Sequence, residues 1–156
     1  MVGKRLFKHS SSIPQSKSIS SLIEALGVKK QNPKEIIEEY QRRIEKRQPD
    51  VEAWQTLDWD FVNRQIFDLG KREVTKRGSL YGIPFGVKDI FDTADLPTAY
   101  GSDIYESNRP TADAAAVARL RSAGAVVMGK TVSTEFAYWK PGKTRNPLDL
   151  ARTPGG

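Results

Sequence analysis

Residues 82–90 read Gly82-Ile83-Pro84-Phe85-Gly86-Val87-Lys88-Asp89-Ile90, a mostly apolar stretch with a single lysine. The run of apolar residues predicts a β-strand over Ile83 to Ile90. Pro84 and Gly86 interrupt it, and such residues favour an edge or irregular strand whose backbone is closely approached by another group. In an extended segment Lys88 and Asp89 point to opposite faces, which hinders a direct ion pair between them. The stretch therefore surrounds Lys88 with apolar residues and keeps the nearest carboxylate away from it.

These surroundings make Lys88 a candidate catalytic base. A lysine acts as a base only in its neutral form, which desolvation favours and an adjacent carboxylate opposes. The alternative is a lysine at a strand end that extends its amine into water. The residues alone leave both interpretations open.

The composition of the 156-residue chain restricts the other sites that it could form. The absence of cysteine excludes disulfides, cysteine-ligated metals and a thiol nucleophile from this sequence. His9 is the single histidine, so these residues cannot build a Ser-His-Asp triad or a multi-histidine metal site. Covalent catalysis would have to use oxygen or nitrogen, with lysine as the base.

The net charge of +6 raises the question of a nucleic-acid partner. The 25 basic residues are interspersed with 19 acidic ones and form no dense block, so we predict a mixed, solvated surface without nucleic acid as a ligand. A noncatalytic basic interaction domain stays as an alternative. No run of about 18 apolar residues is present, which predicts a chain without a membrane span and a cytoplasmic location.

The chain divides into a leader and one domain. Residues 1–23 contain no acidic residue and are rich in serine, so we predict a flexible leader over residues 1–19. The leader loosely resembles an organellar transit peptide, and whether it is a targeting segment stays open. Residues 20–156 form the domain, and the 38% hydrophobic content suffices for a core.

Start and stop signals place helices and further strands in this domain. Asn32-Pro33-Lys34-Glu35 combines an N-cap, a first-turn proline and a capping-box glutamate, so a helix begins there and Gln48-Pro49 is expected to close it. Helical or strand patterns also predict a helix over 20–26, a strand over Trp54–Leu57, a helix from Asp58 to about Lys76, a helix capped by Thr111 with Gly124 at its C′ position, a buried strand over Ala125–Met128, and a short helix from Ser133.

Residues 124–131 match a phosphate-loop pattern letter for letter, with Gly129-Lys130-Thr131 as its functional end. A phosphate loop follows a strand, whereas here a helix precedes Gly124 and the spacer is four apolar residues. These four residues are better explained as the strand itself. A nucleotide-binding protein is therefore the alternative, and a helix-to-strand turn is the interpretation that we favour.

Several blocks of the sequence together resemble the amidase signature family. They are Leu80 to Asp89, Thr98-Ala99-Tyr100-Gly101-Ser102, Asp113 to Leu120, Ala123-Gly124-Ala125, Gly129-Lys130-Thr131, Thr134-Glu135-Phe136-Ala137 and Asn146-Pro147. The resemblance covers about residues 20–156 and is most specific from Leu80 onward. It implies an α/β fold, namely the amino-terminal part of the amidase signature fold, with a mixed sheet flanked by helices.

The resemblance also implies an activity, the hydrolysis of carbon–nitrogen bonds in amides by a Ser-cisSer-Lys triad. The lysine motif of the family falls on Lys88, which would act as general base and acid. No metal or organic cofactor is implied, and the substrate-binding residues cannot be assigned. Phe136, Tyr138 and Trp139 are equally compatible with a pocket near the site and with packing.

The family's serine- and glycine-rich signature begins with Pro-Gly-Gly, which here is Pro154-Gly155-Gly156. Both triad serines would follow this point, and we assign surface or capping roles to Ser102, Ser133 and the other serines between Ser79 and Ser133. The resemblance thus predicts an amino-terminal portion of an amidase domain that is inactive alone.

Three kinds of partner follow from this interpretation. They are a small-molecule amide substrate, the missing carboxy-terminal portion of the domain, and further copies of the chain in a homo-oligomer. An alternative within the family is the A-type component of a glutamine-dependent tRNA amidotransferase.

Overall fold

The computed structural model describes residues 17–27 and 30–155. Residues 1–16 of the predicted leader lie outside this part of the chain, so the leader stays a prediction. The longer elements are α1 (Ile19–Gly27), α2 (Pro33–Val51), β1 (Trp54–Leu57), α3 (Trp59–Gly70), β2 (Pro84–Lys88), α4 (Ala115–Ser122) and β3 (Val126–Thr131). Three short 3₁₀ turns are η1 (Val74–Lys76), η2 (Asp103–Tyr105) and η3 (Glu135–Ala137).

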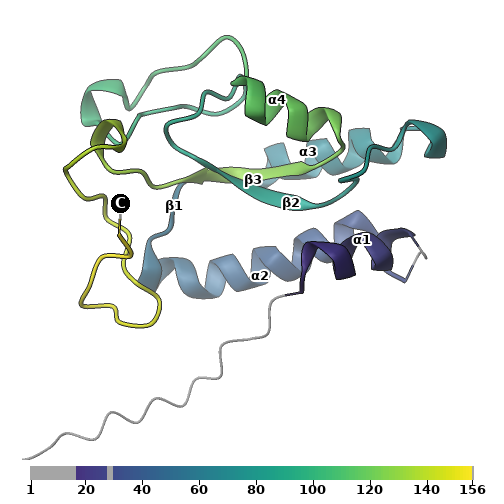
Figure 1. Ribbon diagram of the computed structural model, residues 1–156, viewed down its shortest axis with the longest axis horizontal. Helices are drawn as coiled ribbons and strands as arrows, with labels where there is room; N and C mark the ends of the chain where they lie inside the picture. The colour runs from purple at the N-terminus through teal and green to yellow at the C-terminus, as the bar shows by residue number, and fades with distance from the viewer. Residues whose placement is uncertain (1–16, 28–29, 156) are drawn as a thin grey trace, which may run out of the picture.

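The three strands form a mixed sheet with helices on both faces (Figure 1). The order is β1-β3-β2, in which β3 pairs antiparallel with β1 and parallel with β2. In Figure 1, α1 and α2 lie below the sheet, α4 lies above it, and α3 runs behind β3. This arrangement confirms the α/β fold with a mixed, helix-flanked sheet.

β2 is an edge strand of this sheet, as Pro84 and Gly86 predict. Its register with β3 shifts between Phe85 and Gly86. A Cβ atom at Gly86 would lie 2.9 Å from Thr131 Cγ2 and 3.1 Å from Trp54 Cη2, so the close neighbours of this backbone are Thr131 and the Trp54 ring. The glycine is needed because a side chain would displace the indole that covers the strand.

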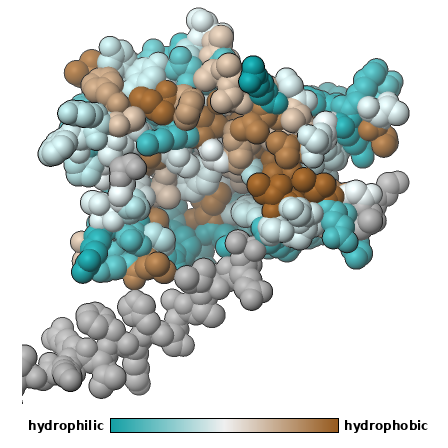
Figure 2. All heavy atoms as spheres, in the orientation of Figure 1, coloured by the Kyte–Doolittle hydropathy of each residue, from teal (hydrophilic) through white to brown (hydrophobic). Residues whose placement is uncertain are grey.

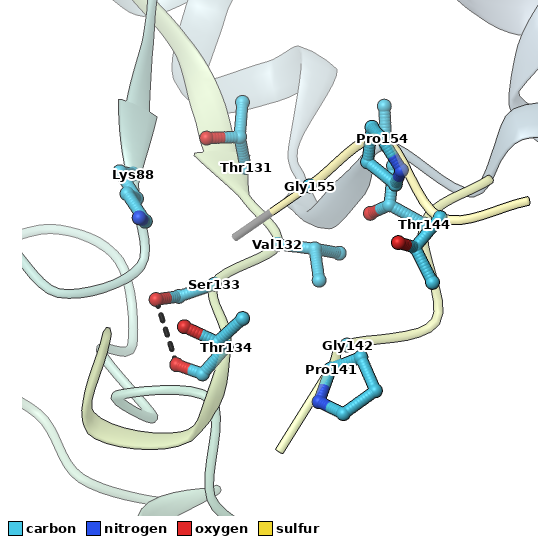
Figure 3. Close-up of a pocket in the computed structure, with 12 residues that line it drawn as sticks. Lys88, Thr131, Val132, Ser133, Thr134, Pro141, Gly142, Thr144, Pro154 and Gly155 are labelled. Carbon is cyan, nitrogen blue, oxygen red and sulfur yellow. Dashed lines mark hydrogen bonds between the residues drawn. The ribbon is translucent and has the colours of Figure 1, made fainter. Parts of the chain in front are cut away.

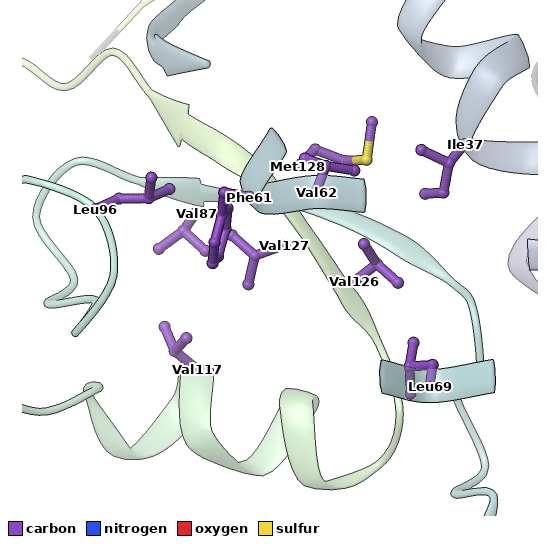
Figure 4. Packing of buried hydrophobic residues seen from close by; sticks show 10 residues of the cluster. All are labelled: Ile37, Phe61, Val62, Leu69, Val87, Leu96, Val117, Val126, Val127 and Met128. Atoms are coloured by element: carbon purple, nitrogen blue, oxygen red, sulfur yellow. The ribbon is translucent and has the colours of Figure 1, made fainter. Parts of the chain in front are cut away.

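The core lies between the sheet and its helices. β3 supplies Val126, Val127 and Met128, all at most 2% exposed. Figure 4 shows these three side chains with the rest of the cluster, which comprises Ile37, Phe61, Val62, Leu69, Val87, Leu96 and Val117. A smaller cluster of Leu22, Ile36 and Ile83 joins α1 and α2 to the start of β2. The predicted apolar strand over 125–128 is thus the centre of the fold, and the strand continues to Thr131.

α2 begins with the predicted capping box. The Glu35 amide donates to Asn32 Oδ1 at 3.0 Å, and the Asn32 amide donates to Glu35 Oε2 at 3.0 Å. The expected end at Gln48-Pro49 is wrong, because the helix continues to Val51. Pro49 lies in the exposed last turn, where water can solvate the carbonyl that the proline leaves without an amide partner.

Two other helix boundaries differ from the prediction. α3 starts after the N-cap Asp58 but ends at Gly70, so residues 71–76 leave the helix and only η1 follows. Glycine and the absence of a continuing apolar stripe explain this earlier end. Thr111 does not cap α4, since the N-cap residue is Ala114, whose amide donates to Asp92 O at 3.0 Å. Gly124 does take the predicted C′ position with φ 90°.

No helix within the described residues is long and apolar enough to cross a membrane. Figure 2 shows hydrophilic and apolar side chains interspersed over one face, with a continuous apolar area on its right-hand side. Several large apolar side chains are solvent-exposed, among them Ile19 at 60% and Ile104 at 82%. The fold therefore leaves apolar surface uncovered in the isolated chain.

The capping box predicts a measurable contribution of Asn32 to stability. Asn32→Ala removes the acceptor of the Glu35 amide and should lower the free energy of unfolding by about 1 kcal/mol in urea denaturation. Glu38→Ala is the matched control, because it removes only an exposed 3.8 Å ion pair with Lys34 on the same helix. The control should change stability by less than about 0.5 kcal/mol. Equal effects of the two variants would contradict the capping role.

Candidate active site

The register of β2 on β3 places two lysines on opposite faces of the sheet. Lys88 lies beside Thr131, and Val87 lies beside Lys130. Because side chains alternate along each strand, Val87 and Lys130 point into the core while Lys88 and Thr131 point to the other face. The sequence-predicted candidate Lys88 therefore stands at the end of an edge strand, outside the core.

The face that carries Lys88 holds a cavity of about 190 Å³. Figure 3 shows Lys88 at the end of β2, facing the segment of Thr131, Ser133 and Thr134. The Ser133 hydroxyl donates to Thr134 O at 2.8 Å. Lys88 is half-buried, and within the described part of the chain its amine has no hydrogen-bond or ion-pair partner. The cavity thus contains a lysine amine that no other group of the described residues engages.

The carboxy-terminal segment forms the opposite wall of this cavity. Thr144 Oγ1 donates to Glu52 O at 2.9 Å and the Arg145 amide donates to Val51 O at 2.8 Å, which anchors the segment to the end of α2. Pro154 and Gly155 consequently line the same cavity as Lys88 (Figure 3). The structure brings together the predicted catalytic lysine and the start of the predicted signature.

The other lysine, Lys130, is fully buried and makes several polar contacts. Its ammonium donates to Phe91 O at 2.8 Å and to Thr98 Oγ1 at 2.5 Å, and it lies 3.2 Å from Asp89 Oδ1. Asp89 is 1% exposed, and its Oδ2 accepts from the Ala99 amide at 3.1 Å. As predicted, Asp89 does not pair with Lys88, since its charge partner is Lys130.

Burial opposes the charge on both members of this pair. Desolvation raises the pKa of Asp89 above its ordinary value, against the attraction of the Lys130 charge. Desolvation also lowers the pKa of Lys130, against the attraction of Asp89. Each charge is therefore retained in the core only because the other is present.

The phosphate-loop alternative is excluded for Gly129-Lys130-Thr131. These residues belong to β3, and Lys130 has no exposed surface. Gly124 ends the turn after α4 with a positive φ, so the match to the motif combines a helix terminus with a strand. A lysine at this place cannot reach a bound phosphate.

Other sequence-based assignments near the site need correction. Ser102 and Ser133 are 4% and 3% exposed, so they are buried and do not have the expected surface roles. Phe136, Tyr138 and Trp139 do not pack in the core, because they are 51%, 84% and 82% exposed. The cavity-lining residues likewise do not include these aromatics.

The buried pair of Asp89 and Lys130 is the feature that the sequence analysis missed. The available signal was a lysine within an apolar strand next to a Lys-Asp dipeptide, since a buried lysine requires a counter-charge. Among the described residues no group of three or more histidine or carboxylate side chains could hold a metal ion.

Comparison with known proteins identifies relatives over most of the chain. A family model described as Amidase matches residues 35–156. The chain is 38% identical over 146 residues to the A-type component of glutamyl-tRNA(Gln) amidotransferase from Bdellovibrio bacteriovorus, an alignment that covers 89% of this chain and 30% of that protein. The chain thus spans about a third or less of the length of this relative.

Solved structures give the same result. Native peptide amidase from Stenotrophomonas maltophilia superposes with a TM-score of 0.81 at 30% identity, over 90% of this chain and 32% of that one. The A-type component of glutamyl-tRNA(Gln) amidotransferase from Thermotoga maritima gives a TM-score of 0.68 at 26% identity, over 90% of this chain and 29% of that one. The described fold is therefore shared with part of each of these larger proteins.

The coupling between the two buried charges can be measured by a double-mutant cycle. Asp89→Asn or Lys130→Met alone leaves a buried charge or polar group without its partner and should cost about 3–5 kcal/mol of unfolding free energy in urea. The double variant removes both charges and should recover most of this loss. Additive losses in the double variant would show that the pair is not coupled.

Proposed function

The chain belongs to the amidase family, and from this membership we propose that it forms part of an enzyme that hydrolyses carbon–nitrogen bonds in amides, with Lys88 as the catalytic base. The observation that carries the proposal is the unpaired Lys88 amine in a cavity walled by Pro154 and Gly155. The family's lysine motif and the beginning of its signature thus face one cavity.

In this proposal the other two members of the triad are serines that follow the Pro-Gly-Gly position in an intact domain. A neutral Lys88 accepts a proton through the bridging serine while the nucleophilic serine attacks the amide carbonyl, and then returns it to the departing amine. Backbone amides in the signature stabilise the tetrahedral oxyanion. The cytoplasmic location and the small-molecule amide substrate belong to the same proposal.

The proposed second candidate is the A-type component of a glutamine-dependent tRNA amidotransferase. Its support is the 38% identity to the protein from Bdellovibrio bacteriovorus. Against it stands the higher TM-score of 0.81 to a peptide amidase, compared with 0.68 to an amidotransferase component. Glutaminase activity that requires a copurifying protein would favour the amidotransferase, and amide hydrolysis without one would favour the free-standing amidase.

The test of Lys88 uses an intact amidase domain that contains this segment. Lys88→Ala removes the base and should lower kcat by about 10²–10⁴-fold for a primary amide substrate, measured by ammonia release. Lys88→Arg should fail similarly, because a guanidinium does not lose its proton near neutral pH. Lys76→Ala is the control, since Lys76 is exposed and pairs only with Glu73 at 2.9 Å. A folded Lys88→Ala variant with undiminished turnover would remove Lys88 from the mechanism.

The uncovered apolar surface generates a separate expectation for the 156-residue chain. We propose that the remainder of an amidase domain covers this surface in the intact enzyme. Without it, exposed side chains such as Ile104 and Trp139 should cause self-association that increases with protein concentration. Sedimentation velocity measures this directly, and a sharp monomer boundary at all concentrations would contradict the expectation.

A further inference from the structure

We propose that the buried pair of Lys130 and Asp89 positions Lys88 at the cavity, so that Lys130 is a positioning residue of the site. This inference rests on the proposed function of Lys88. Lys130 itself does not touch the cavity, since it is fully buried on the opposite face of the sheet. Its effect would be transmitted through Asp89, the residue that directly follows Lys88.

The contacts of Asp89 fix the end of β2 from two directions. Its amide donates to Thr131 O at 2.8 Å, which continues the β2–β3 ladder one residue beyond Lys88. Its carboxylate binds the Ala99 amide through Oδ2 and faces the Lys130 ammonium through Oδ1. The backbone that carries Lys88 is thus held between a strand on one side and a buried ion pair on the other.

The contacts of Lys130 extend the restraint to the loop after β2. Its ammonium binds Phe91 O and Thr98 Oγ1, and Thr98 Oγ1 also lies 3.5 Å from Phe91 O. Residues 89–99 therefore close around one ammonium group. Because this group is shared between the strand end and the loop, a movement of either would break contacts of the other.

An ionic pair suits this role better than apolar packing of the same volume. A buried pair contributes little net stability, because desolvation offsets most of the attraction. Its contacts are directional, however, and satisfy the donors of Lys130 only in one arrangement of strand and loop. A group that must be held at a fixed position for proton transfer benefits from such support.

The experiment measures the accessibility of Lys88 in the 156-residue chain by trace acetylation of lysine amines, quantified for each lysine by mass spectrometry. Lys130→Met and Asp89→Asn should each raise the acetylation rate of half-buried Lys88 by roughly tenfold, because the strand end opens locally. The exposed lysines Lys34 and Lys71 serve as internal references whose rates should not change.

A matched control separates positioning from a general loss of stability. Leu69→Ala truncates a buried residue of α3, which lies at the far end of the core cluster from Val87 and Leu96 (Figure 4). It destabilises the fold without touching the pair, so the acetylation rate of Lys88 should stay close to wild type. A rise in Leu69→Ala as large as in Lys130→Met, or no rise in Lys130→Met, would overturn the inference.

A further variant covers the case in which the single charge removals do not fold, as judged by the absence of a urea transition. Asp89→Asn combined with Lys130→Met leaves no buried charge but still lacks the ammonium contacts to Phe91 and Thr98. Lys88 should remain more reactive than in wild type, and a wild-type rate would overturn the inference. Acetylation needs no turnover, so this result is independent of the activity test of Lys88→Ala.

Discussion

The parallel register of β2 on β3 is the constraint on which the rest of this structure depends. It sets Val87 beside Lys130 and Lys88 beside Thr131, and alternation then decides which lysine enters the core. A slip by one residue would exchange the two faces, burying Lys88 and exposing Lys130. The register shift between Phe85 and Gly86 is part of this arrangement, because the Trp54 ring occupies the space above the glycine.

The two lysines show how environment assigns different roles to the same side chain. Lys130 has its ammonium surrounded by Asp89, Phe91 O and Thr98 Oγ1, so its charge and donors are used within the protein. Lys88 has no such partners among the described residues and faces a cavity. A lysine whose donors are all engaged cannot serve as a base, whereas an unengaged one beside a cavity can. The motif that resembles a phosphate loop contains the structural lysine.

Much of the fold was predictable because local signals coincide with the final structure. The capping box at Asn32 and Glu35, the strand Trp54–Leu57 and the C′ glycine Gly124 all follow from short-range chemistry. The errors at Pro49 and Thr111 occur where solvent or a distant segment decides the boundary. Pro49 is tolerated in an exposed turn, and the start of α4 is fixed by Asp92, which sequence spacing does not reveal.

The candidate site was predictable only in part, for a similar physical reason. The chemical nature of Lys88 follows from its neighbours, but its cavity depends on contacts between Thr144, Arg145 and the end of α2, which are distant in the sequence. These contacts fix where Pro154 and Gly155 lie. Polypeptide that continues from this wall starts beside Lys88, so the same anchoring that closes the cavity would also determine where catalytic groups from the signature could meet the lysine.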